Sequence, residues 1–146
     1  MKIAIDAGHG SDTSGKRTPD GYREHYANVV VANYLYDILN ANPSQFEIIR
    51  TGWNDDDYLD DKDTALSTRQ KTIKNNGCQI SISIHFNAAS GQGRGVEVYT
   101  YEGRQYQDAL DVYTNIAAIL GIPNRWVKVG AGLYVIRKTT AKSMLI

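Results

Sequence analysis

Short apolar runs alternate along the chain with longer segments in which apolar residues recur about every 3.6 positions. The runs that indicate strands are 2–5, 46–49, 79–85 and 96–101, and two further apolar runs follow at 133–136 and 144–146. The segments with helical spacing are 22–42, 64–76 and 105–120. This alternation predicts a single α/β domain with a mostly parallel, twisted sheet of about six strands and helices on both faces.

Length and charge limit the classes of function. The chain has 146 residues, enough for one domain with a real core, and its 16 basic residues balance its 16 acidic ones. We therefore expect no nucleic-acid partner. No apolar stretch approaches the roughly 20 residues that span a bilayer, so we expect no membrane insertion. The chain opens on a predicted strand instead of a signal peptide, which favours synthesis in a cytoplasm without a sorting signal of its own.

Two histidines and one glutamate occupy positions where chemistry is expected. His9 follows the first apolar run, His85 ends the run 79–85, and Glu24 lies in the first turn of the first predicted helix. Open α/β sheets bind ligands at the carboxyl ends of their strands. Two imidazoles and one carboxylate are the protein ligands of a catalytic zinc site, which keeps a fourth position for water. Each residue alone also fits a plain role in hydrogen bonding or in complementing the helix dipole.

His25, the third histidine, directly follows Glu24. Consecutive helical residues point about 100° apart, so the two side chains are not expected to face the same metal ion. Glu24 shares a helix face with Asn28 and Ala32, which makes Glu24 the inward-facing residue. We expect His25 at the surface or behind the ligands.

A phosphate-binding loop is the rival interpretation of the same region. The segment Gly10–Lys16 nearly matches the loop pattern and follows a strand. Arg17, however, stands where the pattern needs a serine or threonine hydroxyl for magnesium. The turn at 19–21 then interrupts the helix whose amino end would hold the phosphates. The sequence therefore does not predict nucleotide binding.

An acidic run between the second strand and the second helix suggests calcium. It lacks the glycine and the terminal glutamate of the helix-loop-helix calcium pattern, so we interpret it as a solvated loop with a helix cap. Its members are Asp55, Asp56, Asp57, Asp60, Asp61 and Asp63. The only cysteine, Cys78, fits a small core residue.

Three motifs in order resemble a known enzyme family. They are Gly8-His9-Gly10, Glu24 with Asn28 one turn later, and the segment 83–88 around His85. Together they resemble the zinc-dependent N-acetylmuramoyl-L-alanine amidases of the amidase-3 type, found in bacterial autolysins and phage endolysins. The resemblance covers almost the whole chain and includes Arg69, the segment 93–98 and the stretch 124–146. It implies zinc (Zn²⁺) on His9, Glu24 and His85, bacterial peptidoglycan as partner, and cleavage of the amide between the muramic acid lactyl group and L-alanine.

The chain departs from the family at its end. Members carry a further glutamate directly after an apolar strand resembling Ser143–Ile146, whereas this chain stops at Ile146. The family implies that this glutamate is the general base or the stabiliser of the tetrahedral intermediate. We therefore expect residues 1–146 to form an amidase catalytic domain that is incomplete at its C-terminus, with Glu97 as a weak substitute.

Two positions bear on the substrate. Asn87, beside His85, is predicted to bind it, with a structural role in the loop turn as the alternative. Trp126 stands where family members often have glycine, a surface change that alters substrate contacts. The loss of the expected glutamate leaves a second function open, a non-catalytic peptidoglycan-binding or regulatory module that retains the metal cleft.

The resemblance also bears on where the protein acts. The lack of a signal peptide favours a phage endolysin over a secreted autolysin. Such a protein is made in the host cytoplasm and acts at the cell wall. We also expect an additional cell-wall-binding domain in the parent protein.

Overall fold

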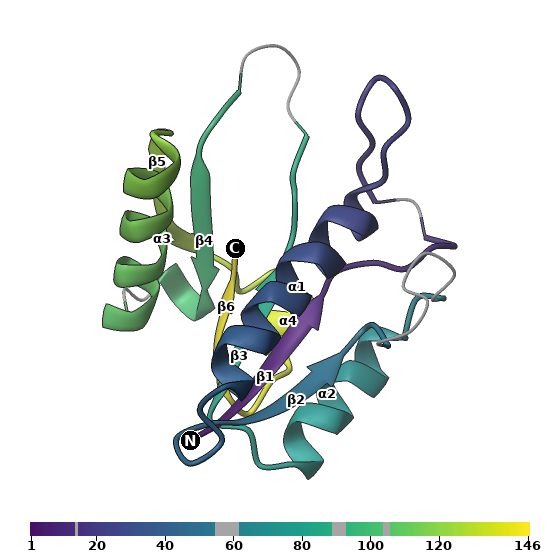
Figure 1. Ribbon diagram of the computed structural model, residues 1–146, viewed down its shortest axis with the longest axis vertical. Helices are drawn as coiled ribbons and strands as arrows, with labels where there is room; N and C mark the ends of the chain where they lie inside the picture. The colour runs from purple at the N-terminus through teal and green to yellow at the C-terminus, as the bar shows by residue number, and fades with distance from the viewer. Residues whose placement is uncertain (14, 55–61, 89–92, 104–105) are drawn as a thin grey trace.

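The computed structural model describes residues 1–13, 15–54, 62–88, 93–103 and 106–146, and these form one six-stranded sheet with helices on both faces (Figure 1). The strands are β1 (Lys2–Ala7), β2 (Glu47–Thr51), β3 (Ile80–Ile84), β4 (Val96–Thr100), β5 (Asn124–Val129) and β6 (Lys142–Leu145). The helices are α1 (Glu24–Asn40), α2 (Leu66–Asn75), α3 (Gln107–Leu120) and α4 (Tyr134–Arg137), with a 3₁₀ turn at Tyr101–Gly103.

The strand order is β2-β1-β3-β6-β4-β5, and neighbouring strands run parallel except where β4 meets β6. The last strand of the chain therefore lies in the middle of the sheet, and Tyr99 pairs with Leu145 across the antiparallel junction. The carboxyl ends of β1 and β3, which are adjacent and parallel, lie at the same edge of the sheet. The expected single α/β domain with a mostly parallel sheet of about six strands is confirmed.

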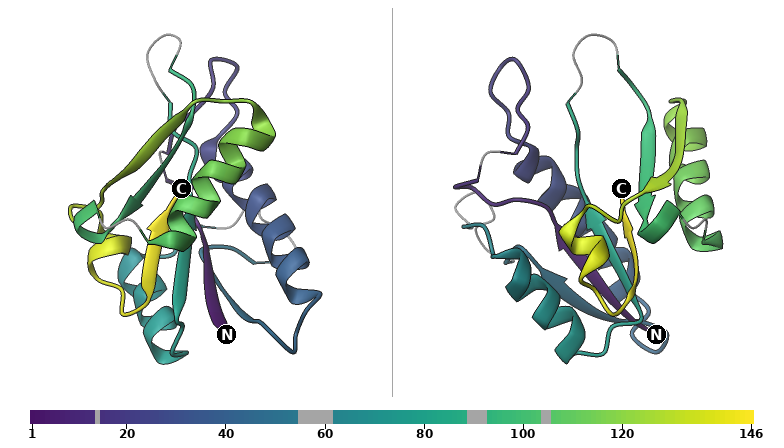
Figure 2. Two further views of the ribbon diagram at one scale, coloured as in Figure 1. Left: turned by 90° about the vertical axis from the view of Figure 1, so that its left-hand side faces the viewer. Right: turned by 180° about the vertical axis from the view of Figure 1, so that it is seen from behind.

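Helices α1 and α3 cover one face of the sheet, and α2 and α4 cover the other (Figure 2). Side chains of β1 divide between the two layers because successive strand residues point to opposite faces. Ile5 packs in a cluster with Val29 of α1, whereas Ala4 packs with Ile73 of α2. A third cluster joins β4, β6 and α3 around Val98, which is fully buried.

The predicted helices end within two residues of the observed ones, although the expected start of the third, Gln105, lies outside the described residues. Strand β5 was not predicted from the sequence. That strand lies at the edge of the sheet with mainly exposed or half-buried side chains, so it lacks the alternation that marks a half-buried strand. It also contains a bulge opposite Val96–Val98, where Trp126 has φ 70°. The apolar run 133–136 lies mainly in the short helix α4.

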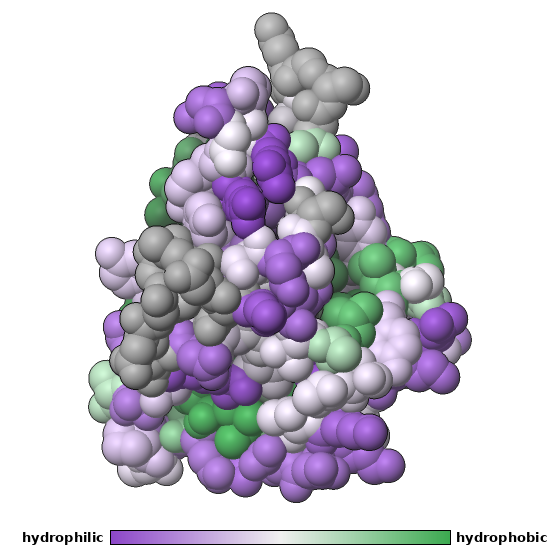
Figure 3. Space-filling model, turned by 90° about the vertical axis from the view of Figure 1, so that its right-hand side faces the viewer, coloured by the Kyte–Doolittle hydropathy of each residue, from purple (hydrophilic) through white to green (hydrophobic). Residues whose placement is uncertain are grey.

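Hydrophilic residues cover most of the face on the side of β2 and α2, and the apolar residues there form small separate groups (Figure 3). Cys78 is buried, as expected, and packs with Ala4 and Ile73. Among the residues that the structure describes, every helix is too short or too polar to cross a membrane.

Candidate metal centre

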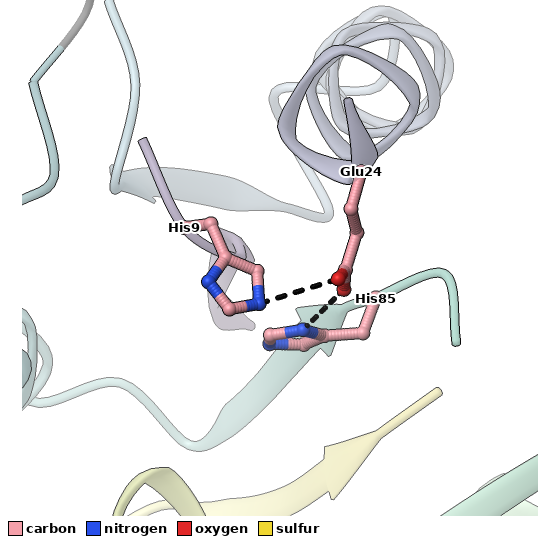
Figure 4. A group of neighbouring side chains, drawn as sticks. All are labelled: His9, Glu24 and His85. Carbon is pink, nitrogen blue, oxygen red and sulfur yellow. Dashed lines mark hydrogen bonds and ion pairs between the residues drawn. The ribbon is translucent and has the colours of Figure 1, made fainter. Parts of the chain in front are cut away.

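His9, Glu24 and His85 come from three different elements and point toward one another (Figure 4). Glu24 Oε1 lies 2.9 Å from His85 Nδ1, and Glu24 Oε2 lies 3.4 Å from His9 Nε2. The two imidazole rings stand nearly perpendicular, with an interplanar angle of 82° and centroids 5.1 Å apart. Residues far apart in sequence thus place two ring nitrogens and a carboxylate around one point.

The backbone around the site leaves no room for larger residues. His9 has φ 65°, a left-handed conformation that costs about 1–3 kcal/mol and persists only where surrounding contacts hold it. A Cβ added at Gly8 would clash with three ring atoms of His85, so this glycine lets the ring pack against the backbone. A Cβ at Gly15, which has φ 37°, would approach the His9 ring to 3.3 Å. The positions of both histidine rings therefore depend on glycines in the neighbouring backbone.

Glu24 is the anchor of the group. Its side chain is 4% exposed and accepts hydrogen bonds from the backbone amides of Lys16, at 2.7 Å, and Phe86, at 3.2 Å. Burial acts to raise the pKa of Glu24, but hydrogen bonds from His85, His9 and the Lys16 amide outweigh it and hold the pKa far below its ordinary value. The carboxylate is therefore ionised and fixed in position.

Glu24 in turn changes the titration of His9. The hydrogen bond to Glu24 raises the pKa of His9, because it favours the protonated ring more than burial disfavours it. A cation bound between these residues would compete with that proton, since a metal needs the neutral imidazole.

The donor set fits zinc. One donor atom from each residue lies within 4.8 Å of the other two. Tetrahedral zinc with bonds of about 2.0–2.2 Å keeps its donors roughly 3.3 Å apart. The two oxygens of Glu24 lie near this spacing from the rings, Oε2 at 3.4 Å from His9 Nε2 and Oε1 at 2.9 Å from His85 Nδ1. Two imidazole nitrogens and a carboxylate would leave one coordination position open.

Glu97, named as a weak substitute for a catalytic glutamate, lies outside this group. Its carboxylate on β4 accepts hydrogen bonds from Lys128 Nζ and, at 3.0 Å, from Tyr99 Oη. Burial acts to raise the pKa of Glu97, but the hydrogen bonds from Lys128 and Tyr99 lower it overall. A carboxylate with a lowered pKa is a weak proton acceptor at neutral pH.

Asn87 and His25 lie near the site in different ways. Asn87 is exposed, and its Oδ1 accepts a hydrogen bond from the Ala88 amide at 3.0 Å, which fits the structural role in the turn. His25 is 1% exposed, so of its two expected positions, at the surface or behind the ligands, the surface is excluded. The buried face of α1 is wide enough to include both Glu24 and His25.

The glycine-rich loop packs against the group of His9, Glu24 and His85 and does not lead into a helix as a phosphate-binding loop would. Helix α1 begins only at Glu24, well after the loop, and the Lys16 amide donates to Glu24. Gly10 packs directly on the backbone at Asp63. Ser14 lies outside the described residues.

In the acidic run, Asp55, Asp56, Asp57, Asp60 and Asp61 lie outside the described residues. Asp63 forms an ion pair with Arg69 at 2.6 Å. It does not cap α2, whose N-cap is Ala65, without a side-chain cap.

A buried polar network behind the ligands was not predicted from the sequence. Asp6 of β1 accepts hydrogen bonds from Ser83 Oγ, at 2.6 Å, and Thr51 Oγ1, at 2.7 Å, and pairs with Arg69 at 2.7 Å. The Arg69 side chain is 1% exposed. An arginine in a predicted helix is expected at the surface. Only the family resemblance had marked Arg69 as a residue of interest.

Comparisons with known proteins agree with this geometry. The sequence matches the family model described as N-acetylmuramoyl-L-alanine amidase over residues 3–146. It is 29% identical over 150 residues to the uncharacterized protein YqiI of Bacillus subtilis, covering 98% of this chain and 66% of the relative. It is 26% identical over 157 residues to the uncharacterized protein CPE1502 of Clostridium perfringens, covering 100% of this chain and 42% of the relative. The chain thus spans less than two thirds of the length of either relative.

Two solved structures are similar throughout the chain. The catalytic domain of CwlV, an N-acetylmuramoyl-L-alanine amidase from Bacillus (Paenibacillus) polymyxa, superposes with a TM-score of 0.84 at 28% identity, covering 99% of this chain and 77% of that one. The N-acetylmuramoyl-L-alanine amidase AmiC2 of Nostoc punctiforme gives a TM-score of 0.84 at 26% identity with the same coverage. The match of the family model over nearly the whole sequence is decisive, and the chain belongs to the N-acetylmuramoyl-L-alanine amidase family.

Proposed function

We propose that this chain is a zinc-dependent hydrolase of peptidoglycan that cleaves the amide between N-acetylmuramic acid and L-alanine. The observation that carries the proposal is the convergence of His9, Glu24 and His85 within 4.8 Å at the carboxyl ends of β1 and β3. Family membership supports the substrate class. Because peptidoglycan forms the bacterial wall, we infer that the protein acts there. We also infer a further wall-binding domain in the natural protein, since this chain spans less than two thirds of the length of its two relatives.

The residues of the chain have separate roles in this proposal. His9 and His85 would hold zinc through their ring nitrogens, and Glu24 would hold it through the carboxylate that the Lys16 and Phe86 amides fix in place. When bound, zinc supplies a Lewis acid for the amide carbonyl and lowers the pKa of a water molecule to about 7. The low pKa of Glu24 keeps this ligand ionised, so metal binding needs no proton removal from it. Asn87, exposed just after His85, is the proposed substrate contact.

A general base is the remaining requirement. The family resemblance puts a glutamate directly after the strand that corresponds to β6, and the His85 amide donates to the Ile146 carbonyl at 2.9 Å. A glutamate in the position after Ile146 would therefore lie beside a zinc ligand. We infer that such a residue would move the proton.

A second candidate function rests on the ligand group itself. Among the described residues, Glu24 is the one carboxylate in the group, and it is committed to holding the metal. With that carboxylate holding the metal, the described residues also fit a peptidoglycan-binding module that retains the metal cleft.

The experiment measures zinc content and wall hydrolysis of the purified chain. We expect one zinc ion per chain and the release of new L-alanine amino termini from purified cell walls, more slowly than from a chain extended past Ile146, detected by amino-group labelling and mass spectrometry. His9→Ala and His85→Ala should each remove both signals. His25→Ala is the matched control and should keep zinc, because His25 is outside the ligand group.

A version extended past Ile146 by the corresponding family segment separates the two candidates. Faster hydrolysis by the extended chain supports the proposed glutamate, and hydrolysis by the extended chain alone favours the binding module for the unextended one. Equal hydrolysis by both would contradict the role given to that glutamate. Absence of zinc from the unsubstituted chain would refute the proposed function.

A further inference from the structure

The backbone carbonyls of Ala7, Gly8 and His9 all accept hydrogen bonds from side chains of two helices. Arg69 of α2 donates from Nη1 to the Ala7 carbonyl at 2.5 Å and from Nη2 to the His9 carbonyl at 2.9 Å. Asn28 of α1 donates from Nδ2 to the Gly8 carbonyl at 2.8 Å. Because α1 and α2 cover opposite faces of the sheet, the end of β1 is held from both sides. We call Arg69 and Asn28 the carbonyl clamp.

Arg69 is itself fixed on every side. Its Nε donates to the Thr64 carbonyl at 2.7 Å, and its two terminal nitrogens pair with Asp6 at 2.7 Å and Asp63 at 2.6 Å. A guanidinium presents five donors in a rigid plane, whereas the lysine ammonium presents three around one atom. Lysine at this position keeps the charge but does not reach all of these acceptors.

Asn28 is equally enclosed. Its side chain is fully buried, one helical turn after Glu24 on the same face of α1. The helix that supplies the carboxylate ligand therefore also grips the backbone beside His9. A shift of α1 would move Glu24 and the Gly8 carbonyl together.

The carbonyl clamp matters because of the backbone conformation of His9. With φ 65°, this residue is in a region of the backbone that non-glycine residues rarely adopt. Such a conformation persists only where surrounding contacts hold it. We propose that the carbonyl clamp sets the zinc affinity of the site by holding His9 with its Nε2 toward Glu24. This inference rests on the proposed zinc site, and Arg69 and Asn28 are positioning residues because neither supplies an atom of the ligand group.

The test measures the zinc dissociation constant of Arg69→Lys by competition with a chelating dye, starting from metal-free protein. Loss of contacts that orient metal ligands typically weakens binding by roughly 10–100-fold, and we expect a change in this range. The visible spectrum of the cobalt-substituted protein should also change, because it reports the arrangement of the ligands. Neither readout depends on hydrolysis.

Asn28→Ala is the second variant, and it removes the donor to Gly8 without changing charge. We expect it to weaken zinc binding by about 10-fold. Ile73→Val is the matched control for lost stability. Ile73 lies on α2 like Arg69 and is fully buried, but it packs with Ala4 and Cys78. This control should lower Tm and leave the zinc dissociation constant within about twofold.

The outcomes separate this inference from the proposed function. Unchanged zinc affinity in both folded clamp variants would overturn the inference while leaving the zinc site standing. If both variants stay unfolded at low temperature with excess zinc, the inference is also overturned, because the clamp is then a requirement for folding and not for affinity. If the unsubstituted chain binds no zinc, both the proposed function and this inference are refuted.

Discussion

The carboxyl end of β1 and the region around β4, β6 and α3 are stabilised by different kinds of contact. At the carboxyl end of β1, buried polar side chains such as Asp6, Arg69 and Asn28 bond to residues from other elements. In the other region, apolar side chains form the buried cluster, and the polar pairs of Glu97 lie nearer to solvent. The group of His9, Glu24 and His85 lies entirely in the first region.

The difference shows which contacts determine the orientation of side chains at the site. A buried polar group is costly unless it is hydrogen-bonded, so each partner in the first region also determines an orientation. Apolar contacts depend on volume and shape and tolerate small rotations. We therefore expect changes in the first region to alter zinc binding and changes in the second to alter stability alone.

Removal of zinc should have the largest effect. Free zinc at 1,000 times its dissociation constant stabilises a folded protein by about 4 kcal/mol. A chelator should therefore lower Tm markedly, and amide exchange should increase more in β1 and β3 than in β4 and β5. His85→Ala should show no zinc-dependent change in Tm. The same change in parent and variant would contradict the ligand assignment.

Met144→Ala tests the apolar region. Met144 is 2% exposed and packs in the cluster of β4, β6 and α3, so its truncation should cost about 2–5 kcal/mol of unfolding free energy, measured in urea. Zinc affinity of the folded variant should equal that of the parent. Weaker zinc binding here would show that the two regions are coupled.

Gly8→Ala tests the close packing of the backbone against His85. The added methyl group would overlap the His85 ring, and such overpacking costs about 1–3 kcal/mol and should also weaken zinc binding. Gly132→Ala is the matched control, since a Cβ there meets no atom within 4 Å. Its effect on stability should stay within about 0.5 kcal/mol. Comparable zinc affinity in both variants would refute the packing role of Gly8.

Glu97→Gln should have the smallest effect. Because the pKa of Glu97 is lowered from 4.5, its ionised form stabilises the fold above that pH, and this contribution is lost as pH falls through the lower folded-state pKa. The variant should lose that part of the acid dependence of unfolding, by less than about 1 kcal/mol, since Lys128 is partly exposed. Wall hydrolysis at neutral pH should be unchanged. A large loss of hydrolysis would instead give Glu97 a catalytic role.

Patterns among near neighbours in the sequence determined most of the elements and the edge of the sheet where the ligands stand. Apolar runs indicated β1, β3 and β4, and helical spacing put Glu24 on the same face as Asn28. Such predictions succeed because strand and helix periods are local properties of the backbone. A strand such as β5, at an edge and largely exposed, carries no such pattern.

Only the tertiary structure decided which partners the buried polar groups have. Arg69 reaches the carbonyls of Ala7 and His9 across 62 and 60 positions, and β6 enters the sheet between β3 and β4. His25 became a buried residue because the packed face of α1 is broad. These outcomes depend on contacts between segments distant along the chain, which local periodicity does not encode.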